Sequence, residues 1–554
     1  MTVKENTDPD FCIACREILE MVMEKKITDD RQLNEAKKKL AKKYRLSCLP
    51  KNADVIMAGN QEEQEKVRDI LRRKPVRTIS GVAVIAAMTS PAPCPHGVCV
   101  PCPGGPASEF HSPQSYMGRE PSTMRAIQYE YDPYRIVTGR LKQLNQIGHE
   151  VKKAELIVMG GTFSARSIDY QEWYTKRCLE AMNDFYGKEW RREVRTIGKE
   201  FPYVTLEDVQ LINETAEIRN TGITFETRPD WTSVDHVDRM LELGATKVEI
   251  GVQSTYDFVL SRMKRGHTVA DSIEANRILR DSGLKVGFHM MPGLPGMDSE
   301  REIRNFKRLF INSGFKPDYL KIYPTLVTEG TELNEMWANG EYQAISDEDA
   351  VGILAEIKSL VPKWVRLQRI QRDIPAQQIL SGVRKSNIRQ LAQDRLGQQG
   401  GRCRCIRCRE VGHNILQGKE PDIENIELTV ESYDCCGGKE HFIAFEDTVQ
   451  DILIGFIRLR FPHTPHRREL ENAALVRELH VYGSMVSVGD KARDNDWQHR
   501  GYGAELVSHA EKMASDAGYK KIAIMSGIGV RGYYHKLGYE RDGVYMSTEL
   551  QGKE

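Results

Sequence analysis

The residues of this 554-residue chain that point most directly to chemistry are three cysteines in the segment CPHGVCVPCPGG (94–105). Cys94, Cys99 and Cys102 have the spacing C-x4-C-x2-C. A four-iron cluster normally takes four protein ligands, so three thiolates from one loop would leave one iron free to bind a small molecule. Zinc is the alternative, because His96 or His111 could supply the fourth ligand that zinc usually takes.

A second trio, Cys403, Cys405 and Cys408, lies in RCRCIRCREVG (402–412). Three thiolates at this short spacing favour a structural zinc ion, with a fourth ligand from elsewhere. The candidates for that ligand are His413, Cys435 and Cys436. Several arginines near the trio could pair with RNA phosphates: Arg395, Arg402, Arg404, Arg407 and Arg409. Cys12 and Cys15 have no obvious partner pair, and we expect no metal there.

The apolar patterning predicts a cytoplasmic location. No apolar run approaches the ~18 residues that a membrane span needs, and the first ten residues carry no hydrophobic signal segment. We therefore expect no membrane partner. In a reducing compartment, the 12 cysteines are more readily explained as metal ligands than as disulfides.

The first cysteine loop belongs to a region of alternating strand-like and helical segments between residues 82 and 326. Six apolar segments have strand length: 82–90, 154–161, 223–229, 247–254, 285–293 and 319–326. This alternation predicts an α/β fold with a parallel sheet, either an open doubly wound sheet or a partial barrel. In both folds ligands bind at the carboxyl ends of the strands. The cysteine loop follows the first strand, which favours the iron–sulfur cluster, and Gly160-Gly161 follows the second.

The pattern changes after about residue 425, where strand-like runs precede a helix at 502–517. This predicts a separate α+β domain. The segment QHRGYG (498–503) fits the Q/R-x-x-G-x-G/A pattern that opens the main helix of GNAT acyltransferases. Backbone N–H groups at such a helix start can bind the pyrophosphate of coenzyme A.

Two groups of sequence motifs resemble the two halves of one known protein family. The segments 94–105, VMGGTF (158–163), FETRPD (225–230), VEIGVQS (248–254), RMKRGHT (262–268) and MMPGLPGM (290–297) resemble the radical SAM half of the catalytic subunit of Elongator, the tRNA carboxymethyluridine synthase. RELHVYG (477–483), WQHRGYG (497–503) and RGYYHKLGY (531–539) resemble the GNAT half of the same family. The resemblance runs from about residue 75 to the end of the chain.

The resemblance implies a radical SAM partial (β/α)6 barrel followed by a GNAT domain. Together with the patterning and the basic character of the N-terminal residues, it divides the chain into four segments. We expect a basic helical tRNA-binding region (1–80), the radical SAM domain (81–345), a basic linker with the zinc-binding cysteine loop (346–424) and the acetyl-CoA-binding domain (425–554). Between Arg16 and Arg77 there are 17 basic and 11 acidic residues.

In that family, a 5′-deoxyadenosyl radical from S-adenosylmethionine takes hydrogen from the methyl group of acetyl-CoA. The carbon radical adds to carbon 5 of the wobble uridine in tRNA, and thioester hydrolysis leaves a carboxymethyl group. The implied cofactors are thus a [4Fe-4S] cluster, S-adenosylmethionine and acetyl-CoA. Elongator-like accessory subunits are further expected partners.

The resemblance also assigns residue roles. Cys94, Cys99 and Cys102 would hold the cluster, and Gly160, Gly161 and Thr162 would lie against S-adenosylmethionine. Lys153, Tyr533 and Tyr534 would act near the acetyl group. Coenzyme A would be lined by Glu478, Leu479, His480, Val481, Gln498, Gly501, Tyr502, Gly503 and Ala504.

Three other functions compete with this one. A protein lysine acetyltransferase with an accessory iron–sulfur domain would need a general base in the C-terminal domain, and no clear base stands out there. A small-molecule radical enzyme leaves the acetyl-CoA domain and the basic segments unexplained. An assembly scaffold would not need the intact cysteine trio.

Overall fold

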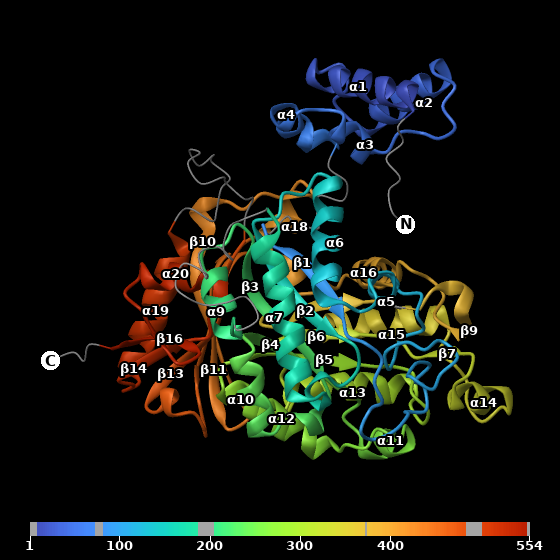
Figure 1. The fold of residues 1–554 in the computed structure, drawn as a ribbon. Helices are drawn as coiled ribbons and strands as arrows, with labels where there is room; N and C mark the ends of the chain where they lie inside the picture. The colour runs from blue at the N-terminus through green and yellow to red at the C-terminus, as the bar shows by residue number, and fades with distance from the viewer. Residues whose placement is uncertain (1–7, 72–80, 187–203, 372–373, 483–500, 551–554) are drawn as a thin grey trace.

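The structure is a computed structural model that describes residues 8–71, 81–186, 204–371, 374–482 and 501–550 (Figure 1). Its central element is a parallel sheet of seven strands in the order β1-β2-β3-β4-β5-β6-β8. The strands are β1 Ala83–Met88, β2 Lys153–Met159, β3 Arg219–Thr227, β4 Ala245–Gln253, β5 Lys285–Met290, β6 Tyr319–Ile322 and β8 Arg366–Ile370. The sheet is curled into a partial barrel, which confirms the predicted fold class.

Helices cover the outer face of this sheet, as right-handed crossovers between parallel strands require. The helices of this domain are α5 Pro121–Gln128, α6 Pro133–Gln146, α7 Ile168–Asp184, α9 Leu206–Asn213, α10 Val234–Glu242, α11 Asp257–Arg262, α12 Val269–Asp281, α13 Ser299–Ile311, α15 Asp347–Leu360 and α16 Ile388–Gln398. Their starts follow local sequence signals. At α12, for example, Thr268 and Asp271 form a reciprocal capping box.

The seventh strand, β8, was not among the six predicted strands. Its sequence, RLQRI, carries two arginines and a glutamine, so it lacks the apolar run that marks the other strands. It pairs in parallel with β6, with Arg366 beside Tyr319. The sheet therefore includes residues from the segment 346–424, which the sequence analysis treated as a linker. Smaller elements also flank the sheet: β7 Leu326–Thr328, α14 Glu332–Ala338, β9 Ile379–Gly382, α17 Ile406–Arg409 and α18 Val411–Ile415.

The C-terminal domain has its own seven-stranded sheet, in the order β10-β11-β12-β13-β14-β16-β15. Its elements are β10 Ile426–Cys435, β11 Gly438–Asp447, β12 Ile452–Phe461, β13 Ala473–Val481, α19 Tyr502–Asp516, β14 Lys521–Ile524, η9 Ile528–Val530, α20 Arg531–His535, β15 Glu540–Asp542 and β16 Tyr545–Glu549. β13 and β14 pair in parallel, and the paired residues of β13 run from Ala473 to Val476. The rest of β13 extends beyond the end of β14, toward the start of α19.

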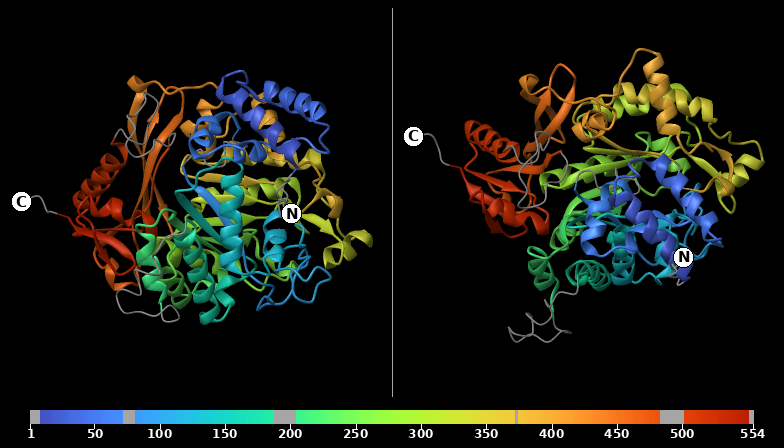
Figure 2. Two further views of the ribbon diagram at one scale, coloured as in Figure 1. Left: turned by 45° about the horizontal axis from the view of Figure 1, so that its top comes forward. Right: turned by 90° about the horizontal axis from the view of Figure 1, so that it is seen from above.

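The N-terminal residues form a separate helical bundle beside α6, seen clearly in Figure 2. Its helices are α1 Pro9–Met23, α2 Asp30–Lys43, α3 Asn52–Met57 and α4 Gln61–Leu71. Apolar side chains such as Ile18, Leu33 and Val55 give the bundle its own core. Among the residues described, no helix is long and apolar enough to cross a membrane.

A buried network of charges joins the C-terminal sheet to the barrel. Arg477 of β13 donates to Asp318, just before β6, at 2.7 Å and to Glu440 of β11 at 2.7 Å. Arg280 of α12 contacts the same two acids at 3.3 and 3.0 Å. All four side chains are at most 1% exposed. Because a buried charge that loses its partner is costly, this network favours one fixed orientation of the two sheets.

Candidate active site

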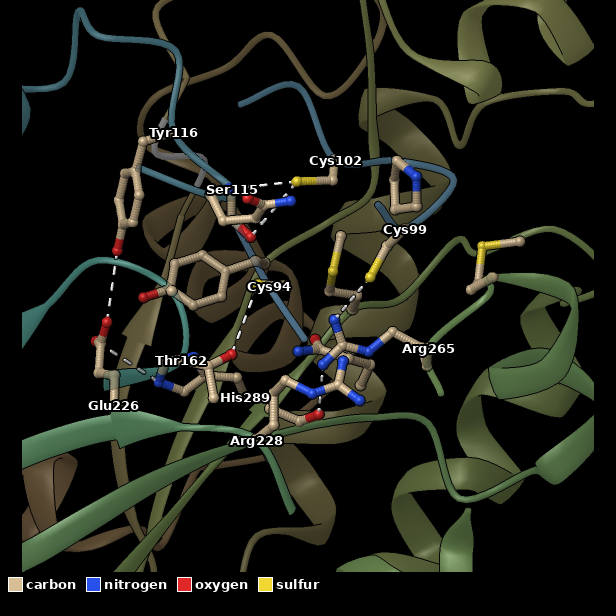
Figure 3. A pocket seen from close by; sticks show the side chains of 18 of the residues that line it. Cys94, Cys99, Cys102, Ser115, Tyr116, Thr162, Glu226, Arg228, Arg265 and His289 are labelled. Atoms are coloured by element: carbon tan, nitrogen blue, oxygen red, sulfur yellow. Dashed lines mark hydrogen bonds and ion pairs between the residues drawn. The ribbon is translucent and has the colours of Figure 1, made fainter. Parts of the chain in front are cut away.

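The first cysteine trio lies in the loop that follows β1, at the carboxyl end of the barrel strands. The three side chains point toward one pocket (Figure 3). Cys94 contacts the Thr162 hydroxyl at 3.5 Å, and Cys102 accepts a hydrogen bond from the Ser115 backbone N–H at 3.3 Å. Burial, followed by the charge of Cys99, raises the pKa of Cys102 to about 11. A positive metal centre would therefore be needed to hold this sulfur as a thiolate at neutral pH.

Polar atoms without partners line the same pocket. Within the described residues, Arg228 Nη1, Arg265 Nε, Gln114 Oε1 and Gln253 Oε1 are buried and have no hydrogen-bond partner. Buried polar groups are normally satisfied, so a concentration of unsatisfied donors and acceptors beside one cavity indicates a polar ligand. The two guanidinium donors and the two amide oxygen acceptors lie beside three thiols, and this combination suits a ligand that carries both charged and polar groups.

The Gly160-Gly161-Thr162 turn brings the end of β2 against the cysteines. Gly161 has φ +90°, and a Cβ there would lie 3.3 Å from Gln114 Cβ and 3.9 Å from Cys94 Sγ. Gly161 and Thr162 line the pocket. Gly160, with φ +124°, instead packs against Thr89, where a Cβ would meet the hydroxyl oxygen at 2.2 Å. The turn thus requires both glycines for different contacts.

The pocket floor carries acidic and basic side chains that the sequence analysis did not single out. His289 contacts Glu249 at 3.0 Å, and the ammonium of Lys321 lies 3.0 Å from Glu226 and also pairs with Glu249. Glu226, Glu249 and His289 have the composition of a metal site. Lys321, however, already supplies the cation between the two carboxylates, so the arrangement favours an ion-pair cluster.

This cluster continues through the barrel toward the C-terminal domain. Lys247 pairs with Glu249 at 3.5 Å and with Glu155 at 3.0 Å. The side chains of Lys247 and Glu249 are 2% and 1% exposed. Lys247 and Glu249 are two residues apart in the segment KVEIG of β4, and this spacing is the sequence signal that could have identified them. A buried strand rarely carries charges at i and i+2 unless they face a polar barrel interior.

Lys153 lies near the C-terminal domain at the amino ends of the barrel strands, opposite to the carboxyl ends where the cysteine trio lies. Lys153 is the first residue of β2 and pairs in register with Arg219, the first residue of β3. The segment around η9 packs there, since a Cβ at Gly527 would meet Thr221 O at 2.1 Å. Burial, followed by the charge of Arg219, lowers the pKa of Lys153. The structure therefore places Lys153 beside the acyltransferase-like domain and away from the cysteine trio.

The candidate coenzyme A site surrounds the start of α19. Gly501 caps the helix with φ +85°, and Gly503 lies in its first turn, where a Cβ would approach Tyr533 Oη at 2.8 Å. Tyr502 packs on Phe445, and Ala504 follows in the same turn. Gln498 lies outside the described residues. The exposed N–H groups at this helix start can bind an anion, as the sequence pattern predicts.

The two tyrosines of α20 have different surroundings. Tyr533 is 38% exposed and its hydroxyl faces Gly503, whereas Tyr534 is 5% exposed and packs edge-on against Tyr539. Burial raises the pKa of both phenols. Both are therefore neutral at physiological pH, and Tyr533 lies nearer to the helix start.

Four of the residues predicted to line coenzyme A lie at the end of β13. Leu479, His480 and Val481 are half-buried, in the part of β13 that extends beyond β14. His480 stacks on Tyr482 with ring centroids 4.2 Å apart, and burial lowers its pKa. Glu478 has structural partners, since it accepts hydrogen bonds from Tyr319 and, at 2.8 Å, from Arg458.

The second cysteine trio forms a compact group beside β8. The sulfurs of Cys403, Cys405 and Cys408 all lie within 4.8 Å of one another. Hydrogen bonds from Cys403 and Cys408 hold the pKa of Cys405 well below its ordinary value. In the described part of the chain, no further His, Cys, Asp or Glu joins this group.

The three candidates for a fourth ligand have other partners. His413 contacts Glu410 at 2.9 Å. Cys435 and Cys436 contact the carbonyl oxygens of Phe315 and Gly314, between α13 and β6. A water molecule or a group outside the described residues would therefore have to complete a tetrahedral site.

The arginines near this trio are less available for RNA than the sequence suggested. The Arg409 side chain is 2% exposed and pairs with Asp451 and Glu446. Arg404 also pairs with Asp451, at 3.1 Å, and Arg395 pairs with Glu348 at 2.6 Å. Arg402 is 66% exposed and contacts Asp451 only at 3.6 Å. Of these four, Arg402 is the most accessible to a polyanion.

Family profiles match in the order of the domains. The Elp3 N-terminal domain matches residues 11–79, the radical SAM superfamily 94–309, the radical SAM C-terminal domain 317–398 and the GNAT acetyltransferase family 412–539. The radical SAM match implies S-adenosylmethionine and a [4Fe-4S] cluster, and the GNAT match implies acetyl-CoA.

Individual relatives match along nearly the whole chain. The tRNA uridine(34) acetyltransferase of Methanocaldococcus jannaschii is 48% identical over 98% of both chains. Elongator complex protein 3 of Saccharomyces cerevisiae is 42% identical over 94% of this chain and 93% of its own. The structure of Methanocaldococcus infernus Elp3 with an N-terminal deletion has a TM-score of 0.74 and 46% identity, covering 85% of this chain and 100% of that one. The chain therefore belongs to the family of Elongator complex protein 3 and the tRNA uridine(34) acetyltransferases.

Proposed function

We propose that this chain carboxymethylates carbon 5 of the wobble uridine in tRNA. The two-carbon unit would come from acetyl-CoA, and a 5′-deoxyadenosyl radical from S-adenosylmethionine would activate its methyl group. The proposal is supported by full-length similarity to relatives named for tRNA uridine(34), together with a radical SAM domain and a GNAT domain in one chain.

The observation that carries the proposal is the buried ion-pair network that joins the two domains. The Arg477–Asp318 pair, 2.7 Å long and fully buried, fixes β13 against the start of β6. The candidate coenzyme A site therefore faces the amino ends of the barrel strands, while the cysteine trio lies at their carboxyl ends. The buried pair would hold these two sites at a constant separation along the barrel, and the acetyl group and the radical would have to cross that separation to meet at one substrate atom.

The residues of the barrel pocket would bind and orient the cosubstrate. Cys94, Cys99 and Cys102 would hold the cluster, which supplies the electron for radical formation when it is bound. The unsatisfied guanidinium atoms of Arg228 and Arg265 would face the charged groups of S-adenosylmethionine. Close approach of the ligand is possible at Gly161 because it has no side chain.

The residues of the C-terminal site would bind acetyl-CoA. Backbone N–H groups at the start of α19, near Gly501 and Gly503, would bind the pyrophosphate. The neutral Tyr533 phenol could donate a hydrogen bond to the acyl group. Lys153, at the barrel end of the same region, would donate to the thioester or to the carboxylate of the product.

The N-terminal bundle would contribute the RNA surface. Lys38, Lys39, Lys42 and Arg45 are exposed on or just after α2. Lys37 is not available, because it is 6% exposed and donates to Asn52. Exposed cations on one helix can pair with phosphates of a tRNA stem.

We also propose that Cys403, Cys405 and Cys408 hold a zinc ion with a structural role. The support is the compact group of three sulfurs, which all lie within 4.8 Å of one another, as ligands of one zinc ion would. The ion would hold the segment around α17 in place. That segment also contacts the start of β8, where Ile406 N–H donates to Val365 O at 3.0 Å.

Anaerobic reconstitution with tRNA, S-adenosylmethionine and acetyl-CoA, followed by mass spectrometry of the nucleosides, tests the proposed function. We expect 5-carboxymethyluridine at the wobble position, and none when Cys94, Cys99 and Cys102 are replaced by alanine. Acetyl-lysine on proteins with no change in tRNA would overturn the proposal in favour of a lysine acetyltransferase.

A further inference from the structure

The three cysteines of the barrel pocket differ in the charge of their surroundings. Cys94 contacts a hydroxyl, from Thr162, and Cys102 accepts from a backbone N–H, from Ser115. Cys99 is the one of the three whose sulfur meets a guanidinium group, because Arg265 Nη1 donates to it at 3.2 Å. Its other close contact is His96 Nε2 at 3.0 Å. The environment of the trio is therefore asymmetric.

Arg265 is held in this position by the backbone. Its Nη2 donates to the carbonyl of Gly251, near the end of β4, at 3.1 Å. Gly251 has no Cβ, and one placed there would lie 3.0 Å from the same nitrogen. The preceding residue, Lys264, has φ +53° and points the opposite way, where it pairs with Glu332 at 2.6 Å and is 58% exposed. The turn thus directs one cation inward and its neighbour outward.

The guanidinium group of Arg265 is not paired with a carboxylate among the described residues. Among the described residues, its side chain makes no ion pair, whereas Arg228 on the same side of the pocket pairs with Asp230 at 2.9 Å. Arginine remains protonated at any physiological pH. A permanent positive charge hydrogen-bonded to a cluster sulfur stabilises the reduced state, which carries one more electron.

We propose that Arg265 sets the reduction potential of the iron–sulfur cluster, raising it through its hydrogen bond to Cys99. The inference rests on the proposed cluster site and adds to it a positioning residue for electron transfer. Arg265 acts on the cluster through the sulfur and does not itself ligate iron. Because this effect is electrostatic, it is present before S-adenosylmethionine binds.

A redox titration monitored by electron paramagnetic resonance, on anaerobically reconstituted full-length protein without S-adenosylmethionine, tests this proposal. For Arg265→Met we expect a lower potential, by at least the ~59 mV that corresponds to a tenfold smaller ratio of reduced to oxidised cluster for a one-electron couple. Arg265→Lys keeps the charge and should keep most of the potential. Arg265→Gln is the second neutral variant, in case the methionine variant does not take up a full cluster.

Lys264→Met is the matched control, because it removes one positive charge from the same turn without touching a sulfur. Its potential should equal that of the unmodified chain. An unshifted Arg265→Met or Arg265→Gln cluster overturns the inference, and so does an equal shift in Lys264→Met, which would reveal only a general charge effect. A chain that forms no four-iron signal at all would overturn the proposed function and this inference together.

Discussion

The hydroxyl of Tyr319, the first residue of β6, donates a hydrogen bond to Glu478 of β13 and so joins the barrel to the C-terminal domain. Burial, followed by the charge of Glu478, raises the pKa of Tyr319, which therefore stays a neutral donor. Glu478 uses its other oxygen to accept from Arg458 at 2.8 Å. One carboxylate thus receives donors from both domains.

Replacing Tyr319 by phenylalanine should weaken this connection. The change leaves one buried carboxylate oxygen without its donor, which costs about 1–3 kcal/mol. We expect a lower midpoint of denaturant unfolding and a larger loss of nucleoside product than of either cofactor's binding. Tyr342→Phe is the control, because Tyr342 donates to Gly293 O at 2.7 Å within the barrel domain. Equal product loss in both variants would contradict a role at the domain junction.

The stability of the domain junction should depend on pH. Burial alone would raise the pKa of Asp318, but Arg280, Arg477 and Arg458 hold it well below its ordinary value. A carboxyl whose pKa is lower in the folded state stabilises the fold above its unfolded pKa of about 3.9, and that contribution is lost as the pH falls further. Stability should therefore fall between about pH 5 and pH 3.

The variant Asp318→Asn isolates this contribution. It leaves Arg280 and Arg477 partly unpaired in a buried site, which should cost about 3–5 kcal/mol at pH 7. Its stability should then vary less with pH than that of the unmodified chain, measured by chemical denaturation over the same range. Asp349→Asn, at the exposed start of α15, serves as the control. An unchanged pH profile in Asp318→Asn would show that other acids dominate.

The sequence predicted those elements whose local patterns are regular. The six apolar strands, the helix at 502–517 and the cysteine trio after β1 could be identified because period, length and spacing are local properties. β8 was not predicted, since its arginines and glutamine mask a strand that is recognisable only from its pairing with β6. The ion pairs of Lys247 and Lys321 also depend on which strands become neighbours, as does the pairing of Arg409 with Asp451.

The second cysteine trio gives a prediction for metal content. Protein purified without oxygen should contain about one zinc ion per chain in addition to iron, because three clustered thiolates are zinc ligands. Cys405→Ser should lose that zinc and lower the thermal midpoint, measured by elemental analysis and scanning calorimetry. Cys48→Ser, which changes an exposed cysteine in the N-terminal bundle, should change neither. Full zinc in Cys405→Ser would place the ion elsewhere.

The glycine turn after β2 predicts a specific effect on cosubstrate binding. Gly161→Ala would place a methyl group beside Gln114 and Cys94 and would strain a backbone at φ +90°. We expect S-adenosylmethionine affinity to fall at least about tenfold, or about 1.4 kcal/mol. Gly330→Ala, with φ +74° and open space around it, carries a similar backbone cost of about 1–2 kcal/mol. It should leave affinity unchanged in equilibrium dialysis, and equal affinity in both variants would contradict the assigned position of the cosubstrate.

The start of α19 allows a stricter test, because the contact involves one identified atom. A Cβ at Gly503 would lie 2.8 Å from Tyr533 Oη, so Gly503→Ala must displace that phenol. The alanine itself favours the helix by about 1 kcal/mol, so stability should not fall. We expect acetyl-CoA affinity to decrease by at least about tenfold, or about 1.4 kcal/mol, in calorimetric titration. Gly397→Ala, in α16 with nothing within 4 Å, controls for the helical effect. Combining Gly503→Ala with Tyr533→Phe removes the clashing oxygen and should return the affinity to that of Tyr533→Phe alone. If the double variant binds as weakly as Gly503→Ala, the methyl group blocks the ligand directly and the orientation of Tyr533 is not the cause.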